Sequence, residues 1–296
     1  AQDIFTLAKS GTPEQIQAAI EAGAKINDRD KDGWTPLMYA AESNKNPDVI
    51  NILLNAGAKI DDRSNYGGTA LMYAAGSNEN PDVITILLNA GAKIDDRDKN
   101  GDTPLMYAAE FNENPDIITA LVNAGAKIDD RDNIDWTPLI YAVLFNQNVE
   151  VITTLLRAGA KIDDRNIIGE TPLMYAARYN ENPEVIKILL NAGAKIDNRS
   201  ILGMTPLINA AEKNENPDVI TTLLNAGADP TIKSKEGKTA LDYAQGNAKL
   251  IGTSAFEMLK NATYGFSTDW VSTTSGSYRV ERLWQEGSLT YALVSY

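Results

Sequence analysis

The sequence is dominated by a repeat of 34 residues that keeps its register from the start of the chain to about residue 262. The copy at residues 101–134 reads GDTPLMYAAEFNENPDIITALVNAGAKIDDRDNI, and near-copies of it lie end to end on either side. One glycine and one threonine show the register, at Gly23, Gly57, Gly91, Gly125, Gly159, Gly193 and Gly227 and at Thr35, Thr69, Thr103, Thr137, Thr171, Thr205 and Thr239. Such a repeat indicates stacked units that contact their neighbours, rather than one compact core.

Each copy predicts two short helices. In the copy above, Thr103 and Pro104 begin the first helix, because a threonine hydroxyl caps an early amide and proline suits the first helical position. Asn114 and Pro115 begin the second helix in the same way, and Gly125 ends it in a left-handed conformation. The second helix carries an apolar stripe, Ile117, Ile118, Leu121 and Val122. Because so short a helix pair exposes this stripe unless another pair covers it, we expect stacked copies to share a continuous core.

The motifs GDTPLMYAA and ALVNAGAKID resemble the ankyrin repeat, which has the signature T-P-L-H-x-A and a unit of one turn and two helices. The resemblance covers residues 1–262 and implies an all-α repeat solenoid, an ankyrin-like stack of about eight helix pairs with β-turn fingers. The period exceeds the usual one of about 33, with the extra residue in the inter-helix loop at 110–114. The signature histidine is replaced by Met38, Met72, Met106, Ile140, Met174, Ile208 and Asp242. We therefore do not expect the hydrogen bonds that this histidine makes between repeats, but we do expect the repeats to stack.

The repeats predict one ankyrin-like domain followed by a tail of different composition. We expect the repeat domain at residues 1–262, with an N-terminal cap repeat at 1–32, six full repeats at 33–236, and a degenerate C-terminal repeat at 237–262. The terminal copies are atypical, as expected for repeats that turn one face toward water. Asp135 stands where the other copies have a turn glycine, and aspartate tolerates the left-handed conformation better than most residues.

Residues 263–296 form a tail rich in serine, threonine and aromatic residues. Residues 277–284 and 288–295 are rich in β-branched and aromatic residues around a Gln-Glu-Gly-Ser turn, which predicts a β-hairpin-like tail. A segment this short is too small to bury an independent core, so we expect the tail to pack on something else. Three alternatives stay open: the tail caps the last helix pair, fills the groove of the array, or exchanges strands between two chains.

The composition excludes most kinds of chemistry. The chain has no cysteine and no histidine, which removes disulfides, thiolate and imidazole metal sites, and every catalytic arrangement that needs either residue. The formal net charge of −13 opposes binding to nucleic acid. No glycine-rich phosphate loop occurs, and no apolar run approaches the roughly 20 residues of a membrane span. We expect a soluble protein that is not an enzyme, has no cofactor or metal, and is either intracellular or exported after signal removal, since it opens at Ala1.

Residues that are identical in copy after copy are best interpreted as scaffold. One ladder is formed by the tyrosines Tyr39, Tyr73, Tyr107, Tyr141 and Tyr175. Its regularity favours packing between repeats over an aromatic binding strip. A second ladder is formed by the aspartates Asp61, Asp95, Asp129, Asp163 and Asp197, with lysines two residues before them and arginines two residues after them. Because calcium loops gather oxygen ligands without such cations, this alternation favours a charge-paired loop surface over a metal site.

Function is expected at positions that vary while the scaffold stays constant. In proteins that this chain resembles, the finger tips and the first-helix surface line the concave groove that holds a partner. The copy at residues 101–134 contributes Asp102, Phe111 and Ile134 there. Apolar residues crowd the fourth to sixth units, and exposed aromatic anchors often dominate interface energy. The candidate partner-binding residues are Trp34, Tyr66, Phe111, Ile134, Trp136, Phe145, Ile168, Tyr179, Leu202 and Met204.

The sequence thus predicts a non-enzymatic protein–protein interaction module that holds a protein or peptide in its concave groove. The alternative is a structural protein that self-associates through residues 264–296, or whose tail caps the array or fills the groove. The partner is not identified by any residue pattern in the chain.

Overall fold

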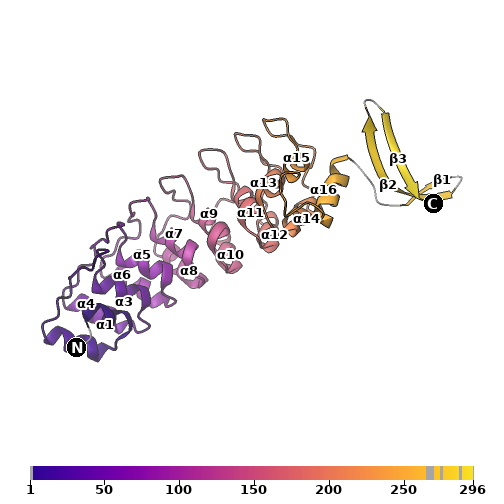
Figure 1. Ribbon diagram of the computed structural model, residues 1–296. Helices are drawn as coiled ribbons and strands as arrows, with labels where there is room; N and C mark the ends of the chain where they lie inside the picture. Colours follow the sequence, from indigo (N-terminus) through magenta and orange to yellow (C-terminus); the bar gives the residue numbers. More distant parts are fainter. Residues whose placement is uncertain (1–2, 265–269, 274–275, 287–288, 296) are drawn as a thin grey trace. The chain divides into compact units, whose positions relative to one another are not determined.

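The computed structural model describes residues 3–264, 270–273, 276–286 and 289–295 (Figure 1). The chain forms two compact units, Ala1–Ile167 and Ile168–Tyr296. Sixteen α-helices lie in the described part of the chain, which confirms the predicted all-α stack of about eight helix pairs. None of the described helices is both long enough and apolar enough to cross a membrane.

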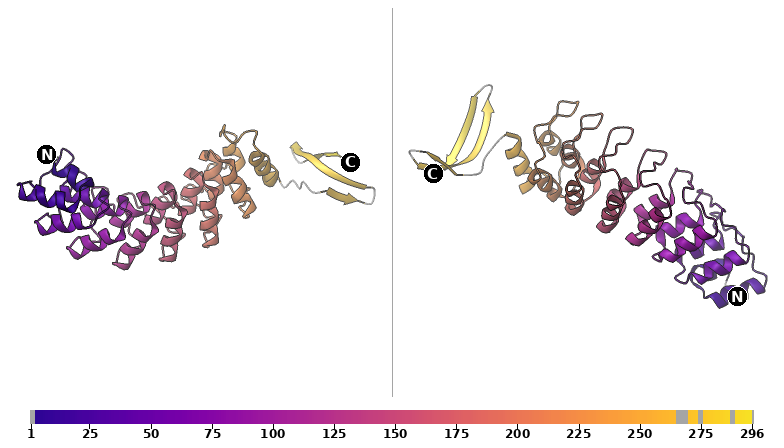
Figure 2. Two further views of the ribbon diagram at one scale, coloured as in Figure 1. Left: turned by 90° about the horizontal axis from the view of Figure 1, so that it is seen from below. Right: turned by 180° about the vertical axis from the view of Figure 1, so that it is seen from behind.

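The helices alternate between a first and a second helix of each repeat. The first unit contains α1 (Ile4–Ser10), α2 (Pro13–Glu21), α3 (Pro36–Ser43), α4 (Asp48–Asn55), α5 (Ala70–Ser77), α6 (Pro81–Asn89), α7 (Pro104–Phe111), α8 (Pro115–Asn123), α9 (Pro138–Phe145) and α10 (Val149–Arg157). The second unit contains α11 (Pro172–Tyr179), α12 (Pro183–Asn191), α13 (Pro206–Lys213), α14 (Pro217–Asn225), α15 (Ala240–Ala244) and α16 (Ser254–Tyr264). Within each unit, consecutive first helices pack on one another, and each second helix packs on the first helix of its own repeat and on neighbouring second helices (Figure 2).

Side-chain caps begin the helices at the predicted places. Thr103 Oγ1 accepts a hydrogen bond from the Met106 amide at 3.4 Å, and Met106 Sδ accepts one from the Thr103 amide at 3.4 Å. The methionine that replaces the signature histidine therefore accepts the reciprocal hydrogen bond of this capping arrangement. At the second helix, Asn114 Oδ1 accepts from the Asp116 amide at 3.0 Å. The predicted apolar stripe follows, with Ile117, Ile118 and Leu121 fully buried.

An asparagine ladder joins consecutive repeats within each unit. Asn112 Nδ2 donates to the carbonyls of Ala75 and Asn78 in the preceding repeat, both at 2.9 Å, and Asn112 Oδ1 accepts from the Asn114 amide at 2.9 Å. Equivalent bonds to the preceding repeat are made by Asn44, Asn78, Asn146, Asn214 and Asn247. These buried amides supply hydrogen bonds between repeats in a chain that lacks the signature histidine.

Arginines make a second set of bonds between repeats, along the loops. Arg63 Nη1 donates to the carbonyl of Arg97 at 2.8 Å, and its other terminal nitrogen pairs with Asp96 at 2.6 Å. Arg29, Arg97 and Arg131 repeat both contacts. The predicted charge-paired loop surface is confirmed. The aspartate that pairs with each arginine, however, follows the predicted ladder by one residue and belongs to the next repeat.

The turn before each first helix needs a left-handed residue. Gly101 has φ of 89°, and a Cβ atom there would lie 2.9 Å from the Asn133 amide nitrogen, so a larger residue would be strained. Asp135 adopts φ of 70° and is the one described residue other than glycine with positive φ. Its carboxylate pairs with Arg131 at 2.8 Å, which holds the turn that glycine makes elsewhere.

The C-terminal segment contains three strands, β1 (Trp270–Thr273), β2 (Gly276–Glu286) and β3 (Leu289–Ser295). They form an antiparallel sheet in the order β1-β2-β3. Residues 287–288 of the predicted hairpin turn lie outside the described residues. The three roles suggested for the tail and the domain boundary at 262/263 stay predictions.

Candidate protein-binding surface

The ladder tyrosines Tyr39, Tyr73, Tyr107 and Tyr141 each bond a finger to the first helix that follows it. Tyr107 Oη donates to Asp98 Oδ2 at 3.0 Å, while Asp98 Oδ1 accepts from the amides of Asn100 and Asp102. One aspartate thus shapes the finger and is held by the tyrosine. The rings of Tyr73 and Tyr107 meet edge to face with centroids 6.2 Å apart, which confirms the predicted packing between repeats. The hydroxyl bonds to the fingers were not predicted.

Two neighbouring finger positions differ sharply in exposure. The residue just before the threonine that caps each first helix is buried at Asp102, Glu170 and Met204 and half-buried at Trp34 and Trp136. The residue two positions earlier is exposed, as at Ile134 and Leu202. The first position is therefore mostly covered, and the second position displays a side chain to solvent.

The ten candidate residues consequently fall into three groups. Seven are well exposed, namely Tyr66, Phe111, Ile134, Phe145, Ile168, Tyr179 and Leu202. Trp34 and Trp136 are half-buried. Trp34 stacks on Tyr73 with centroids 3.9 Å apart, and Trp136 contacts Tyr141 at 5.5 Å. Met204 is only 6% exposed, so a partner would reach little of it in this arrangement.

Three exposed apolar side chains of the first unit, Phe111, Ile134 and Phe145, are 58%, 54% and 46% exposed, and together they are called the apolar patch below. Phe111 and Phe145 end the adjacent helices α7 and α9, and Ile134 is at the finger between them. The Phe111 ring rests beside Gly76 and packs on Tyr107 at 6.1 Å. These contacts limit the rotamers of Phe111, so its ring has less freedom to lose when a partner binds.

Four carboxylates lie beside this patch: Asp98, Asp102, Glu110 and Asp132. Tyr141 Oη is 2.8 Å from Asp102 Oδ1 and 2.7 Å from Asp132 Oδ2. A hydroxyl has one hydrogen to donate. Both bonds can therefore form together only when one of the two carboxyl groups is protonated and donates to the tyrosine oxygen. Burial is the largest cause that raises the pKa of Asp102, and the charges of Asp98 and Asp132 raise this pKa further. Asp102 was singled out by its variable position, whereas its contact with Tyr141 was not predictable from spacing.

Glu110 is the most perturbed acid of this group. Burial, followed by the charges of Asp102 and Asp98, raises the pKa of Glu110 to about 7. Within the described part of the chain, Glu110 has no hydrogen-bond or ion-pair partner. The sequence shows a glutamate at this place in other repeats too, so its type alone gave no signal of this environment.

The pH dependence of stability should reveal Glu110. Its pKa is higher in the folded protein than the ordinary value of 4.5, so its contribution to stability is present below that value and is lost as pH rises through about 7. Glu110→Gln should therefore raise the melting temperature more at about pH 8 than at about pH 5, measured by circular dichroism. Glu113→Gln, at an exposed loop position, is the matched control. An equal change in melting temperature at both pH values for Glu110→Gln would contradict the raised pKa of Glu110.

The second unit shows a different arrangement at the equivalent positions. Glu170 and Arg178 stand 68 residues after Asp102 and Glu110, that is, two repeats later. They form a buried ion pair at 2.9 Å, with the side chains 5% and 17% exposed. Arg178 also donates to Asn209 Oδ1 at 2.7 Å.

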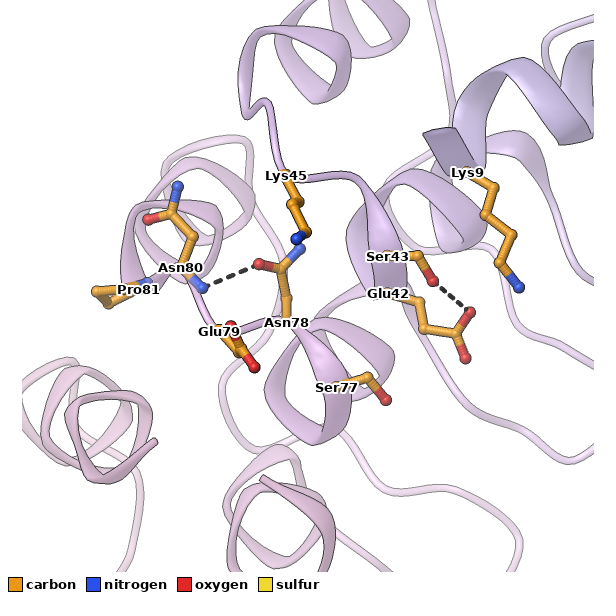
Figure 3. A pocket seen from close by; sticks show the side chains of 9 residues that line it. All are labelled: Lys9, Glu42, Ser43, Lys45, Ser77, Asn78, Glu79, Asn80 and Pro81. Carbon is orange, nitrogen blue, oxygen red and sulfur yellow. Dashed lines mark hydrogen bonds between the residues drawn. The ribbon is translucent and has the colours of Figure 1, made fainter. Parts of the chain in front are cut away.

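Each unit contains at least one hollow in its described part. In the second unit, a pocket of about 340 Å³ brings together the candidates Tyr179, Leu202 and Met204 with Arg178 and Tyr243. In the first unit, a larger pocket of about 710 Å³ lies at the ends of the first helices (Figure 3). It is lined by Lys9, Glu42, Ser43, Lys45, Ser77, Asn78, Glu79, Asn80 and Pro81. None of the ten candidates lines this polar pocket, and in the described residues no group of three or more acidic side chains is arranged to hold a metal ion.

Comparisons with known proteins agree with this architecture. A family profile described as "Ankyrin repeats (3 copies)" matches residues 4–98, 75–166, 148–234 and 173–259. The crystal structure of the human ASB11 ankyrin repeat domain is similar, with a TM-score of 0.67 and 26% identity, over 78% of this chain and 100% of that chain. A search of the curated proteins finds no significant match.

Proposed function

Because the chain belongs to the ankyrin repeat family, whose members are typically non-enzymatic scaffolds for protein–protein interaction, we propose that it binds a partner protein through the variable residues of its fingers and first-helix ends. The observation that carries the proposal is the exposure of the apolar patch. Phe111, Ile134 and Phe145 are exposed, whereas the recurring apolar residues of the helices are buried.

The difference in exposure between the recurring core residues and the variable aromatic residues supports a binding role. Side chains that recur, such as Leu105, Ile117 and Asn112, are nearly fully covered. The exposed aromatics Phe111 and Phe145 rest on ladder tyrosines, which hold them in place. Large aromatic side chains on rigid supports are the residues that most often dominate interface energy.

The proposal is tested with a phage-displayed library of random short peptides selected on the immobilised chain. Phe111→Ala and Phe145→Ala should each weaken the selected peptides on the order of 10-fold or more, because each removes a well-supported anchor. The melting temperature should change little, since both rings are about half exposed. These two positions are preferred to Trp136, which is half-buried, so that its removal would also disturb the framework.

The matched control is Ile251→Ala, which removes an exposed apolar side chain outside the candidate surface. It should leave peptide affinity unchanged. Equal binding of the peptides to the chain with and without Phe111 and Phe145 would overturn the assignment of this surface.

A further inference from the structure

The ladder tyrosines Tyr107 and Tyr141 link the two phenylalanines of the apolar patch to three of the four carboxylates. Phe111 follows Glu110 directly in α7, and the Ile134 amide donates to Asp132 Oδ1 at 2.9 Å. The Phe145 ring lies 6.3 Å from the ring of Tyr141, whose hydroxyl contacts two of the carboxylates. Each member of the patch therefore adjoins an acid, directly or through one side chain.

The acids beside the patch lack a cation. In the part of the chain that the structure describes, Asp98, Asp102, Glu110 and Asp132 form no ion pair with lysine or arginine. The loop aspartates behave differently, since Asp62, Asp96, Asp130 and Asp164 are each paired with an arginine. Charge is therefore balanced along the loops and unbalanced beside the patch. A positive group that arrives with a partner would gain more there than at an open surface, because the acids are already partly desolvated.

The second unit contains a positive group at the equivalent place. At the positions equivalent to Asp102 and Glu110, the chain places Glu170 and Arg178 in a buried ion pair at 2.9 Å. The Arg178 guanidinium lies 5.8 Å from the ring of Tyr179, which is equivalent to Phe111. The repeat framework thus accommodates a guanidinium between the acid of the finger and the aromatic residue that ends the first helix.

Resting on the proposed function, we propose that the segment bound at the apolar patch presents an arginine or lysine side chain to Asp102 and Glu110, flanked by apolar side chains that cover Phe111 and Phe145. Arginine fits better than lysine, because its planar guanidinium can bond two carboxylates and also stack on an aromatic ring. The partner is therefore a protein with an exposed basic and apolar segment.

The test uses the peptides selected on the intact chain from the phage-displayed library. Peptides enriched on the unchanged protein should contain arginine or lysine beside aromatic or aliphatic residues. The double variant Asp102→Asn/Glu110→Gln should weaken them on the order of 10-fold or more, and replacing the basic residue of the peptide by glutamine should have a similar effect. Glu110→Gln alone is the second variant, in case the double variant does not fold.

The control separates a local contact from general attraction by an acidic protein. Asp82→Asn/Asp116→Asn removes the same charge from the exposed starts of α6 and α8 and should leave affinity within about twofold. Equal losses in both double variants would overturn the inference. Peptides without basic residues, sensitive to Phe111→Ala but not to the acid variants, would overturn it and leave the proposed function intact. A library that yields no binder would overturn both.

Discussion

Replacing Asn112 by alanine is expected to lower the free energy of unfolding by about 3 kcal/mol. The Asn112 side chain is 2% exposed and makes three hydrogen bonds, two of them to carbonyls of the preceding repeat. Alanine would leave the carbonyls of Ala75 and Asn78 and the amide of Asn114 without this partner. Each buried polar group left unsatisfied costs about 1–3 kcal/mol, and partial entry of water keeps the total below the full sum.

The measurement is equilibrium unfolding in urea followed by circular dichroism. Because repeats interact mainly with their neighbours, weakening one junction should also broaden the transition as the two sides lose their coupling. Asn123→Ala is the matched control, since Asn123 ends α8 with an exposed side chain. A loss below about 1 kcal/mol for Asn112→Ala would show that the ladder is not a principal source of stability.

Replacing Glu110 by arginine should stabilise the protein and abolish binding of the selected basic peptides at the same time. The change recreates beside Asp102 the arrangement of Glu170 and Arg178, which form an ion pair at 2.9 Å in the second unit. It removes an acid whose pKa burial raises to about 7 and supplies the cation that Asp102 lacks. We expect a gain of about 1 kcal/mol in stability at neutral pH.

Peptide affinity should fall on the order of 100-fold, because the new side chain both occupies the place of the peptide cation and repels it. The affinity is measured by isothermal titration, and the stability by urea unfolding at the same pH. Glu113→Arg makes the same charge change in the exposed loop and should weaken binding only slightly. Full affinity in the Glu110→Arg variant would place the bound cation elsewhere. Such a result would also remove the link between the unpaired acids and binding.

The helices were predictable because their signals are local. Thr103 and Asn114 cap the two helices of their repeat as the sequence indicates, and the apolar stripe of α8 is buried as its spacing requires. Even the unusual turn at Asp135 followed from the chemistry of one residue. The 34-residue period then set the number of helix pairs.

The bonds between repeats were not predictable in the same way. Asn112 recurs at the repeat interval and lies in a polar loop, so its sequence context is that of a turn residue. Its partners Ala75 and Asn78 lie in the preceding repeat, which the sequence of one repeat does not show. Its recurrence in each repeat indicates a structural role, but does not show which groups it bonds. An asparagine that recurs at the same place in every inter-helix loop of the full repeats is the signal that was missed.

The candidate surface was predictable in outline only. The variable series contained Phe111 and Ile134, which are exposed, and also Met204, which is buried because the finger folds its position against the first helix. The meeting of Asp102 with Tyr141 depends on the same folding, which joins residues 39 positions apart. Spacing within one repeat does not contain that information.

Parallel measurements on the neighbouring residues Phe111 and Asn112 test the central claim, that identical residues hold the repeats together while variable residues bind. Phe111→Ala should weaken the selected peptides on the order of 10-fold and leave the urea midpoint nearly unchanged. Asn112→Ala should lower the midpoint clearly and leave affinity within about twofold under conditions where the protein is folded. If instead Phe111→Ala destabilises the chain as much as Asn112→Ala does, and peptide affinity follows stability in both, the separation of framework from binding surface is wrong.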